Sequence, residues 1–231
     1  MEIYGVLLNY GSEDNIKKVE YLKKYISKQK LNKIDRLKKN EDRMRSIIGD
    51  VMVRWAICNK YNLLNENLLF TTNEYGKPFL INNNIKVSFS ISHSGSWVVV
   101  ALSSLEVGID IEKVKDLNVK IAQQFFTPEE NNTLTKLIPE EQLHYFYELW
   151  TLKESYVKAI GKGLSVPLDS FSINTNNQYI TVSPESPYNF RQYLLQNYKL
   201  AVCSLENFFP DYIKVVSLEQ LENLKMFCIN S

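Results

Sequence analysis

The spacing of the apolar residues changes several times along the chain, and each change predicts a different kind of element. Residues 2–8 are rich in β-branched and aromatic side chains, which predicts a strand. Residues 15–60 read as helical, and between 44 and 58 the apolar residues recur every three or four positions. This spacing predicts a helix with one buried stripe, which is formed by Met44, Ile47, Ile48, Val51, Met52 and Trp55.

The middle of the chain predicts a turn followed by strands and then helices. Glycine and proline predict the turn at residues 75–78, and apolar runs predict strands at 85–91, 97–103 and 107–111. From 118 to 160 the pattern becomes helical again. One helix is expected to start at a capping box, because the N-cap residue Thr127 is followed by Pro128 and, at the third position, by Glu130.

The last third of the chain predicts strands at 163–183, 199–204 and 212–216, with a loop marked by Pro184 and Pro187. Both halves of the chain therefore mix helices with hairpin-like strands, and no Gly/Ser-rich linker separates them. This pattern predicts the α+β class, with two lobes that pack closely against each other.

Composition and charge restrict the classes of function. Lys and Arg number 27 against 26 Asp and Glu, so the chain lacks the overall basic charge of a nucleic-acid-binding protein. The three cysteines form no Cys-x-x-Cys pair and there are only two histidines, which excludes zinc fingers. The start shows no signal-peptide pattern and no run of 18 apolar residues occurs. We therefore expect a cytoplasmic globular protein that binds neither nucleic acid nor membrane.

Two acidic residues at the end of the third strand are candidates for a metal site. Asp110 and Glu112 are two residues apart, so on a strand their carboxylates point to the same face. They repel each other unless a cation lies between them, and Mg²⁺ commonly takes one or two protein carboxylates together with substrate phosphates. An exposed strand end with two solvated acids is the alternative interpretation.

A helical segment at residues 150–158 offers a second group of polar side chains. Glu154 shares a helix face with Trp150 on one side and Lys158 on the other, because each pair is four residues apart. Glu154 could be a third metal ligand, and Lys158 could neutralise phosphate charge. The alternative is a surface ion pair beside a core tryptophan.

A third candidate is the short segment at residues 90–95, which we expect to connect two strands. Its hydroxyls, imidazole and glycine could form a cradle for an anion through Ser92 and His93. A nucleophilic serine is the competing interpretation, but the Gly-x-Ser-x-Gly pattern is absent and His144 lies in a predicted helix. The phosphate-binding Gly-x-x-x-x-Gly-Lys-Ser/Thr loop is absent as well.

Together these segments resemble the 4′-phosphopantetheinyl transferases, in particular the long Sfp-type enzymes that activate peptide synthetases. The resemblance runs from the first strand to about residue 216, and the chain is too long for the short, trimeric carrier-protein synthases. It rests on five segments in order: Tyr-Gly-Lys-Pro at 75–78, Phe-Ser-Ile-Ser-His-Ser-Gly at 89–95, Gly-Ile-Asp-Ile-Glu at 108–112, Phe-Phe at 125–126 and Trp-Thr-Leu-Lys-Glu-Ser at 150–155.

The resemblance implies a monomer of two similar α/β lobes packed as a pseudo-dimer, with coenzyme A in the cleft between them. We place the lobes at residues 1–105 and 106–231. The family pattern often has Asn where this chain has Ser90, and Ala where it has Ser155, but neither is a ligand position.

The resemblance also assigns roles to the candidate site residues. It makes Asp110, Glu112 and Glu154 the ligands of Mg²⁺ and Lys158 the contact of the pyrophosphate. Glu130 matches the general base of the family, although the capping box alone would explain it, and Glu154 or a water is the other candidate base. The residues expected to bind coenzyme A are Lys30, Lys33, Arg45, Ser92 and His93 at the 3′-phosphate, and Gly76, Lys77 and Pro78 near the adenine.

The implied reaction is Mg²⁺-dependent transfer of 4′-phosphopantetheine from coenzyme A to a serine of an acyl or peptidyl carrier protein, in nonribosomal peptide and antibiotic biosynthesis. Adenosine 3′,5′-bisphosphate would leave. A non-catalytic module that binds coenzyme A or a carrier protein is one alternative, and a Mg²⁺-dependent phosphohydrolase is another. We expect the carrier protein to dock on the apolar segment at 114–137, which contains Leu117, Val119, Ile121, Phe125, Phe126, Leu134 and Leu137 beside Lys113, Lys115 and Lys120.

Overall fold

The computed structural model describes residues 1–81, 84–175 and 179–224. The helices are α1 (Glu13–Leu22), α2 (Lys28–Ile34), α3 (Asn40–Tyr61), α4 (Pro128–Lys136), α5 (Pro139–Ile160) and α6 (Leu218–Glu222). The strands are β1 (Glu2–Leu7), β2 (Phe70–Thr72), β3 (Pro78–Leu80), β4 (Ser88–Ser94), β5 (Trp97–Ser103), β6 (Val107–Lys113), β7 (Ser172–Asn174), β8 (Thr181–Ser183), β9 (Asn189–Leu195), β10 (Tyr198–Ser204) and β11 (Lys214–Val215). None of the helices in these ranges is long and apolar enough to cross a membrane.

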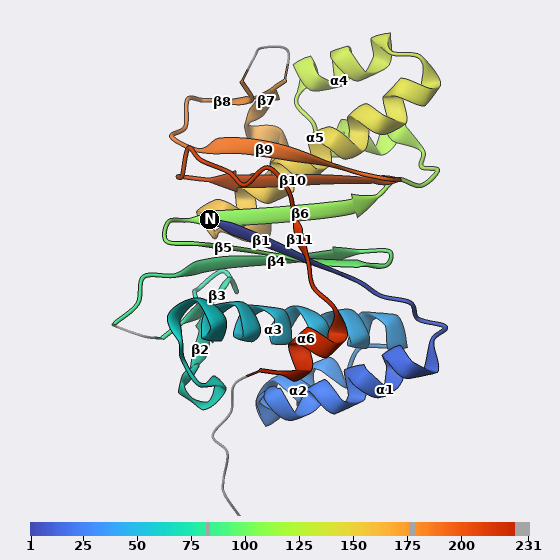
Figure 1. Cartoon of the computed structure of the whole chain (residues 1–231). Coiled ribbons are helices and arrows are strands. Elements are labelled where there is room, and N and C mark those ends of the chain that lie inside the picture. The colour runs from blue at the N-terminus through green and yellow to red at the C-terminus, as the bar shows by residue number, and fades with distance from the viewer. Residues whose placement is uncertain (82–83, 176–178, 225–231) are drawn as a thin grey trace, which may run out of the picture.

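Two sheets lie one above the other and define two lobes (Figure 1). The N-terminal lobe contains the sheet β11-β1-β5-β4, and the C-terminal lobe contains β6-β10-β9. Helices α1, α2, α3 and α6 cover the outer side of the first sheet, while α4 and α5 cover the second (Figure 1). The α+β class and the two-lobed arrangement predicted from the sequence are therefore confirmed.

Helix α3 forms the core of the N-terminal lobe. The apolar stripe predicted along it is buried from Met44 to Met52, because these side chains pack between the sheet and the outer helices. Trp55 at the end of the stripe is half-buried and meets the ring of Tyr4 edge-on at 5.3 Å. The long helix ends at Asn62, which adopts the left-handed conformation with a φ of 53°.

Helix α5 crosses the sheet of the C-terminal lobe in very close contact with β6. A Cβ atom on Gly108 would lie only 1.9 Å from the carbonyl oxygen of Ser155 and 2.4 Å from the nitrogen of Ala159. Only glycine allows this approach. The contact brings the face of α5 that carries Glu154 and Lys158 against the strand that carries Asp110 and Glu112.

The structure differs from the sequence-based expectations in several places. Strand β9 (Asn189–Leu195) falls where only a loop after Pro187 was expected. Ser92 and His93 lie within β4, and a turn at Gly95 and Ser96 makes the connection. Residues 214–222 leave the C-terminal lobe, because β11 pairs in parallel with β1 and α6 packs beside α1. The strands expected at 163–183 are confined to β7 and β8, and 3₁₀ helices at Gly163–Ser165 and Leu168–Ser170 precede them. Residues 176–178 of this expectation lie outside the described ranges.

Candidate active site

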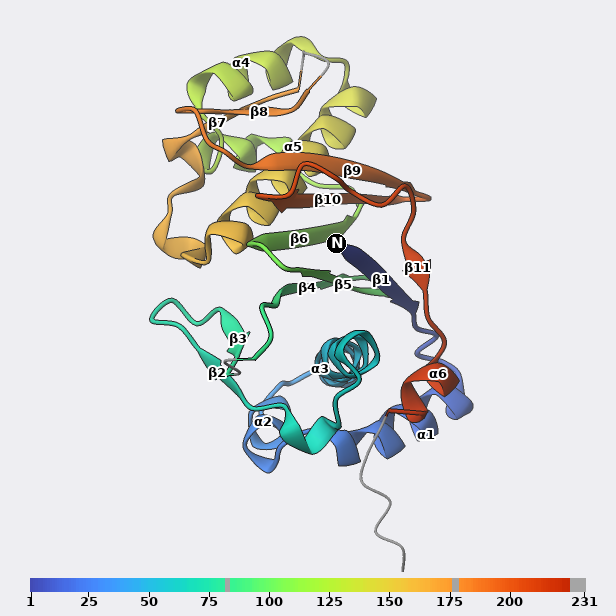
Figure 2. The same ribbon diagram turned by 60° about the vertical axis from the view of Figure 1, so that its left-hand side comes forward.

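A cleft of about 480 Å³ lies where the two lobes meet. Its walls come from α2 and α3 below, from β4 and β6 in the middle and from α5 above (Figure 2). The structure brings eight of the predicted residues to this one cleft, although they come from five separate elements. They are Lys30, Arg45, Ser92, His93, Asp110, Glu112, Glu154 and Lys158.

Asp110 is the most buried carboxylate in the cleft, with 4% of its surface exposed. Its Oδ1 accepts hydrogen bonds from Lys158 Nζ at 2.6 Å and from the Ser92 hydroxyl at 2.8 Å. Its Oδ2 is also buried, yet it has no hydrogen-bond partner among the described residues. A buried oxygen without a partner is costly, so the chemistry of this atom suits contact with a hydrogen-bond donor or a cation.

Glu112 and Glu154 complete a group of three acidic side chains in the cleft. The predicted alternation on β6 is confirmed, because Asp110 and Glu112 both line the cleft while Ile109 and Ile111 are buried in the apolar core. Burial and, secondly, the charge of Asp110 raise the pKa of Glu112 and also that of Glu154. The loss of solvent and the neighbouring negative charge thus both favour a proton or a cation at Glu112 and Glu154.

The three carboxylates do not already form a closed coordination sphere. Within the described ranges, no three His, Cys, Asp or Glu side chains are arranged closely enough to hold a metal ion. The ammonium group of Lys158 instead lies against Asp110. The donor chemistry still suits Mg²⁺, since all three groups are carboxylates and one buried oxygen of Asp110 has no partner.

Basic side chains of the N-terminal lobe line the same cleft, among them Arg45 and His93. The guanidinium of Arg45 pairs with Asp42 and donates to Tyr10 Oη at 3.0 Å and to the carbonyl oxygen of Gly95 at 2.9 Å. Its Nε is buried and lacks a partner among the described residues. Loss of solvent in the cleft, followed by the charge of Arg45, lowers the pKa of the nearby His93.

Two smaller cavities lie beside the main cleft. Lys33 lines a cavity of about 230 Å³ together with Lys30, so it lies next to the main cleft rather than in it. Gly76, Lys77 and Pro78 line a third cavity of about 300 Å³, which they share with Lys158. Ile91 lines all three cavities, so they form a series of neighbouring cavities around this residue.

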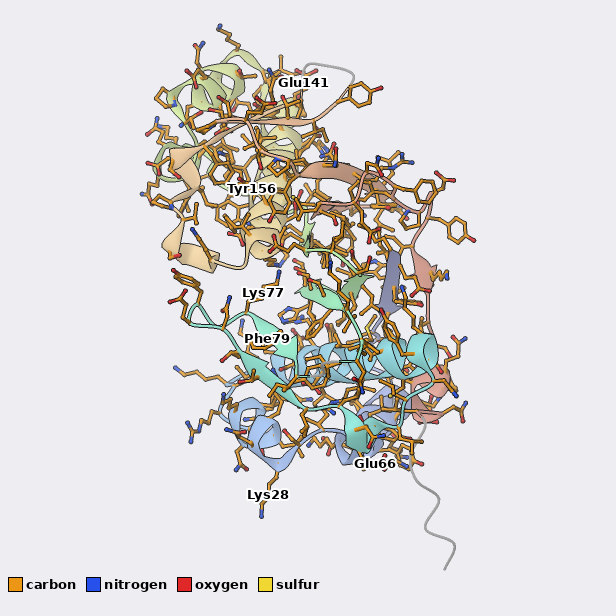
Figure 3. The ribbon with its side chains drawn as sticks, turned by 90° about the vertical axis from the view of Figure 1, so that its left-hand side faces the viewer. Lys28, Glu66, Lys77, Phe79, Glu141 and Tyr156 are labelled. Atoms are coloured by element: carbon orange, nitrogen blue, oxygen red, sulfur yellow. The ribbon has the colours of Figure 1, made fainter. Side chains whose placement is uncertain are left out.

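The side chain of Lys77 connects the β2–β3 hairpin to the C-terminal lobe (Figure 3). Its ammonium donates to the carbonyl oxygens of Val107 at 3.2 Å and of Ala159 at 3.0 Å. Asn73 in the same turn donates to the carbonyl oxygen of Gly161 at 2.8 Å. The Lys77 amine thus binds the end of α5 and the start of β6, while the backbone of the turn remains beside the third cavity.

Glu130 does not line any of these cavities. It completes the predicted capping box, and its Oε2 accepts from the backbone N–H of Thr127 at 2.9 Å and pairs with Lys153 Nζ at 2.9 Å. Its Oε1 accepts from the backbone N–H of Ile173 at 2.8 Å. Only 3% of its surface is exposed. The position of Glu130 therefore favours the structural interpretation over the role of general base.

Two residues with clear structural partners were missed by the sequence analysis. The Ser94 hydroxyl donates to Glu112 Oε2 at 2.7 Å, and the repeated serines at 90, 92 and 94 were the available signal. Lys153 is fully buried and donates to the carbonyl oxygens of Leu168 at 2.8 Å and Phe171 at 2.5 Å. In the sequence it is only one more lysine on a helix.

The apolar segment expected to dock a partner is only partly exposed. Phe126 and Leu134 are buried in the core of the C-terminal lobe, and Val119 and Phe125 pack against it. Leu117 and Ile121 are each 38% exposed, and Ile138 just beyond the segment is 57% exposed. The available apolar surface therefore consists of aliphatic side chains around the 3₁₀ helix at Val119–Gln124.

Comparison with known proteins identifies relatives along most of the chain. A family model described as "4'-phosphopantetheinyl transferase superfamily" matches residues 106–203, and one described as "4'-phosphopantetheinyl transferase, N-terminal" matches residues 14–105. The chain is 41% identical over 228 residues to 4'-phosphopantetheinyl transferase Sfp of Bacillus subtilis (strain 168), covering 96% of this chain and 100% of that protein. It is 39% identical over 189 residues to 4'-phosphopantetheinyl transferase gsp of Aneurinibacillus migulanus, covering 80% and 78%.

Among solved structures, a holo-(acyl-carrier-protein) synthase from Bacillus anthracis str. Ames in complex with CoA (3',5'-ADP) aligns with a TM-score of 0.37 and 16% sequence identity. The alignment covers 43% of this chain and 94% of that chain.

Proposed function

Because the chain belongs to the 4′-phosphopantetheinyl transferase family, we propose that it transfers the 4′-phosphopantetheine group of coenzyme A to a serine of a carrier protein. The observation that carries this proposal is the junction cleft, where Asp110, Glu112, Glu154 and Lys158 converge from β6 and α5. Transfer of a phosphoryl-linked group needs charge stabilisation at such a point.

We assign coenzyme A to the series of three cavities. Coenzyme A carries a 3′-phosphate and a pyrophosphate, so it needs cations at two separate places. Lys30, Lys33 and Arg45 with His93 would serve the 3′-phosphate, since they lie on the N-terminal lobe side of the series. The adenine would lie beside the backbone of Gly76 and Pro78, and the pyrophosphate would lie near Lys158, which lines both neighbouring cavities.

Asp110, Glu112 and Glu154 would hold Mg²⁺, with the unpartnered Oδ2 of Asp110 as one ligand atom. The bound ion would supply charge neutralisation for the pyrophosphate and the leaving group. The ammonium of Lys158 pairs with Asp110 and would also contact the pyrophosphate, since Lys158 lines both neighbouring cavities.

In the chemical step, the serine hydroxyl of the carrier protein attacks the β-phosphorus of coenzyme A. A new oxygen–phosphorus bond forms, and the bond to the bridging oxygen breaks, so adenosine 3′,5′-bisphosphate leaves with that oxygen. We assign the hydroxyl proton to Glu154, directly or through a water, because its carboxylate lines the cleft. Glu130 is not carried into this mechanism, since both of its oxygens have backbone partners.

The carrier protein would dock beside the carboxylates on the aliphatic surface of Leu117 and Ile121. Lys115 and Lys120 are exposed next to this surface and would attract an acidic partner. One chain supplies both walls of the cleft, so we propose a monomer. We also propose that it works in the cytoplasm on acyl or peptidyl carrier domains of nonribosomal peptide and antibiotic synthesis.

The test is intact mass spectrometry of a carrier protein incubated with coenzyme A, Mg²⁺ and this protein. We expect the carrier protein to gain the mass of one phosphopantetheine group. No gain should occur when a chelator removes Mg²⁺ before the reaction starts. Binding of coenzyme A without any gain in mass would instead indicate a non-catalytic module. Release of phosphate from coenzyme A without modification of the carrier would indicate a phosphohydrolase.

A further inference from the structure

The two lobes are joined at β4 and β6 by serine side chains. These strands belong to separate sheets. The hydroxyl oxygens of Ser90, Ser92 and Ser94 accept from the backbone N–H groups of β6, at 3.1 Å from Ile109, 3.3 Å from Ile111 and 3.0 Å from Lys113. Moving two residues along β4 moves the contact two residues along β6 in the same direction, so the two strands run parallel. We call this row of three contacts the seam. The serine hydroxyls thus accept hydrogen bonds from N–H groups that would otherwise need backbone carbonyl oxygens of a neighbouring strand.

Two of the three serines use the hydroxyl hydrogen for a second bond. Ser92 donates to Asp110 Oδ1 at 2.8 Å, and Ser94 donates to Glu112 Oε2 at 2.7 Å. In each case the carboxylate belongs to the β6 residue that directly precedes the one whose N–H donates to the same serine. For Ser90 the equivalent residue is Gly108, which has no side chain. Ser90 therefore makes the contact to β6 without any contact to a carboxylate.

We propose that Ser94 is a positioning residue that holds Glu112 in place for Mg²⁺. This inference rests on the proposed function, because it takes Glu112 as a ligand of the ion. Glu112 lies on the same face as Asp110, and two like charges repel each other. The hydroxyl of Ser94 opposes that repulsion by binding one oxygen of Glu112 and leaving the other available. The hydroxyl is itself fixed, since it also accepts from the N–H of Lys113.

The same geometry links the metal site to the lobe that would bind the 3′-phosphate. Ser94 is the last residue of β4, and it directly precedes Gly95, whose carbonyl oxygen accepts from Arg45. The position of Glu112 is thereby set by the N-terminal lobe, although Glu112 itself belongs to the C-terminal lobe. Hydrogen bonds of this kind to metal ligands commonly change metal affinity by about 10- to 100-fold when they are removed.

The competing explanation is that Ser94 only holds the seam together. The chain offers a matched control for this, because Ser90→Ala removes the same kind of contact to β6 but no contact to a carboxylate. The experiment uses Ser94→Ala, Ser90→Ala and Ser94→Thr, of which the last keeps the hydroxyl. Mg²⁺ binding is measured by calorimetry and by thermal shift on the protein with coenzyme A and without a carrier protein, so that no turnover occurs.

We expect Ser94→Ala to weaken Mg²⁺ binding on the order of tenfold. Ser90→Ala should lower the unfolding temperature about as much as Ser94→Ala does, but its Mg²⁺ dissociation constant should stay within about twofold of the wild type. Ser94→Thr should bind Mg²⁺ as the wild type does. Equal weakening in Ser94→Ala and Ser90→Ala, or none in either, would overturn the inference and leave the proposed function standing. A wild-type protein that modifies a carrier but binds no Mg²⁺ would overturn both this inference and the metal site.

Discussion

The role of Glu130 can be separated experimentally from that of a general base. The change is Glu130→Gln, which keeps the size of the side chain but removes its charge. The carboxylate now accepts from two backbone N–H groups, of Thr127 and Ile173, and pairs with the fully buried Lys153. An amide has only one acceptor oxygen, so the glutamine turns an N–H group toward one of these donors and leaves Lys153 without its counter-charge.

The burial of the Glu130–Lys153 ion pair determines how much free energy of unfolding the substitution is expected to cost. Breaking one partner of a buried ion pair costs about 3–5 kcal/mol, because the remaining charge stays in a medium of low polarity. Burial already lowers the pKa of Lys153, and the contact with Glu130 opposes this effect. Without Glu130 the lysine can lose its proton, which limits the cost. We expect a loss of about 3 kcal/mol, which is a large part of the roughly 5–15 kcal/mol that typically stabilises a folded domain.

The assay measures the free energy of unfolding in urea at 25 °C and, separately, kcat at a temperature where the variant is folded. Glu130→Gln should be clearly destabilised yet keep a kcat within about tenfold of the wild type, since loss of a general base costs about 10²–10⁴-fold. The double variant Glu130→Gln/Lys153→Met should recover part of the lost stability. A kcat lowered by 10²-fold or more with unchanged stability would refute the reasoning and restore Glu130 as the base.

Four further predictions address the cleft and its surroundings. Asp110→Ala and Glu154→Ala should each abolish Mg²⁺-dependent turnover, and a near-wild-type rate at saturating coenzyme A in either variant would contradict the metal assignment. Arg45→Ala should raise KM for coenzyme A about 10- to 100-fold, as expected for one charge-assisted contact, and leave KM for dephospho-coenzyme A nearly unchanged; equal losses would make Arg45 structural. Leu117→Glu should raise KM for the carrier protein alone, and an unchanged KM in a folded variant would place docking elsewhere. Burial lowers the pKa of Lys77 from 10.5 to about 8, so between these pH values the unfolded chain binds more protons than the folded chain and the free energy of unfolding should rise with pH. Lys77→Met should flatten that rise, which urea unfolding measured across this pH range would detect.

The parts of the fold that were predictable from the sequence depend on short-range patterns. The buried stripe of α3 follows from a spacing of three to four residues, and the shared face of Asp110 and Glu112 follows from the two-residue period of a strand. The capping box at Thr127 involves residues only three positions apart. In each case the interacting groups are close in sequence, so the local pattern contains the information.

The parts that were missed depend on contacts between distant segments. Strand β9 is an outer strand with alternating exposure, and Leu194 on it is 98% exposed, so it lacks a continuous apolar run. The return of residues 214–222 to the N-terminal lobe depends on pairing with β1, about two hundred positions earlier in the chain. The partner of Glu130 on α5 could not be inferred either, because nothing near Lys153 in the sequence marks it as buried.

The candidate site combines both kinds of information. The sequence places Asp110 and Glu112 on one face, and separately places Glu154 and Lys158 on one face of a helix. What joins the two faces is the contact at Gly108, where α5 passes too close to β6 for any side chain. A glycine before an acidic pair is a weak signal in the sequence, since glycine also occurs in turns. In the structure it decides the distance between strand and helix, and so whether Lys158 reaches Asp110 at 2.6 Å.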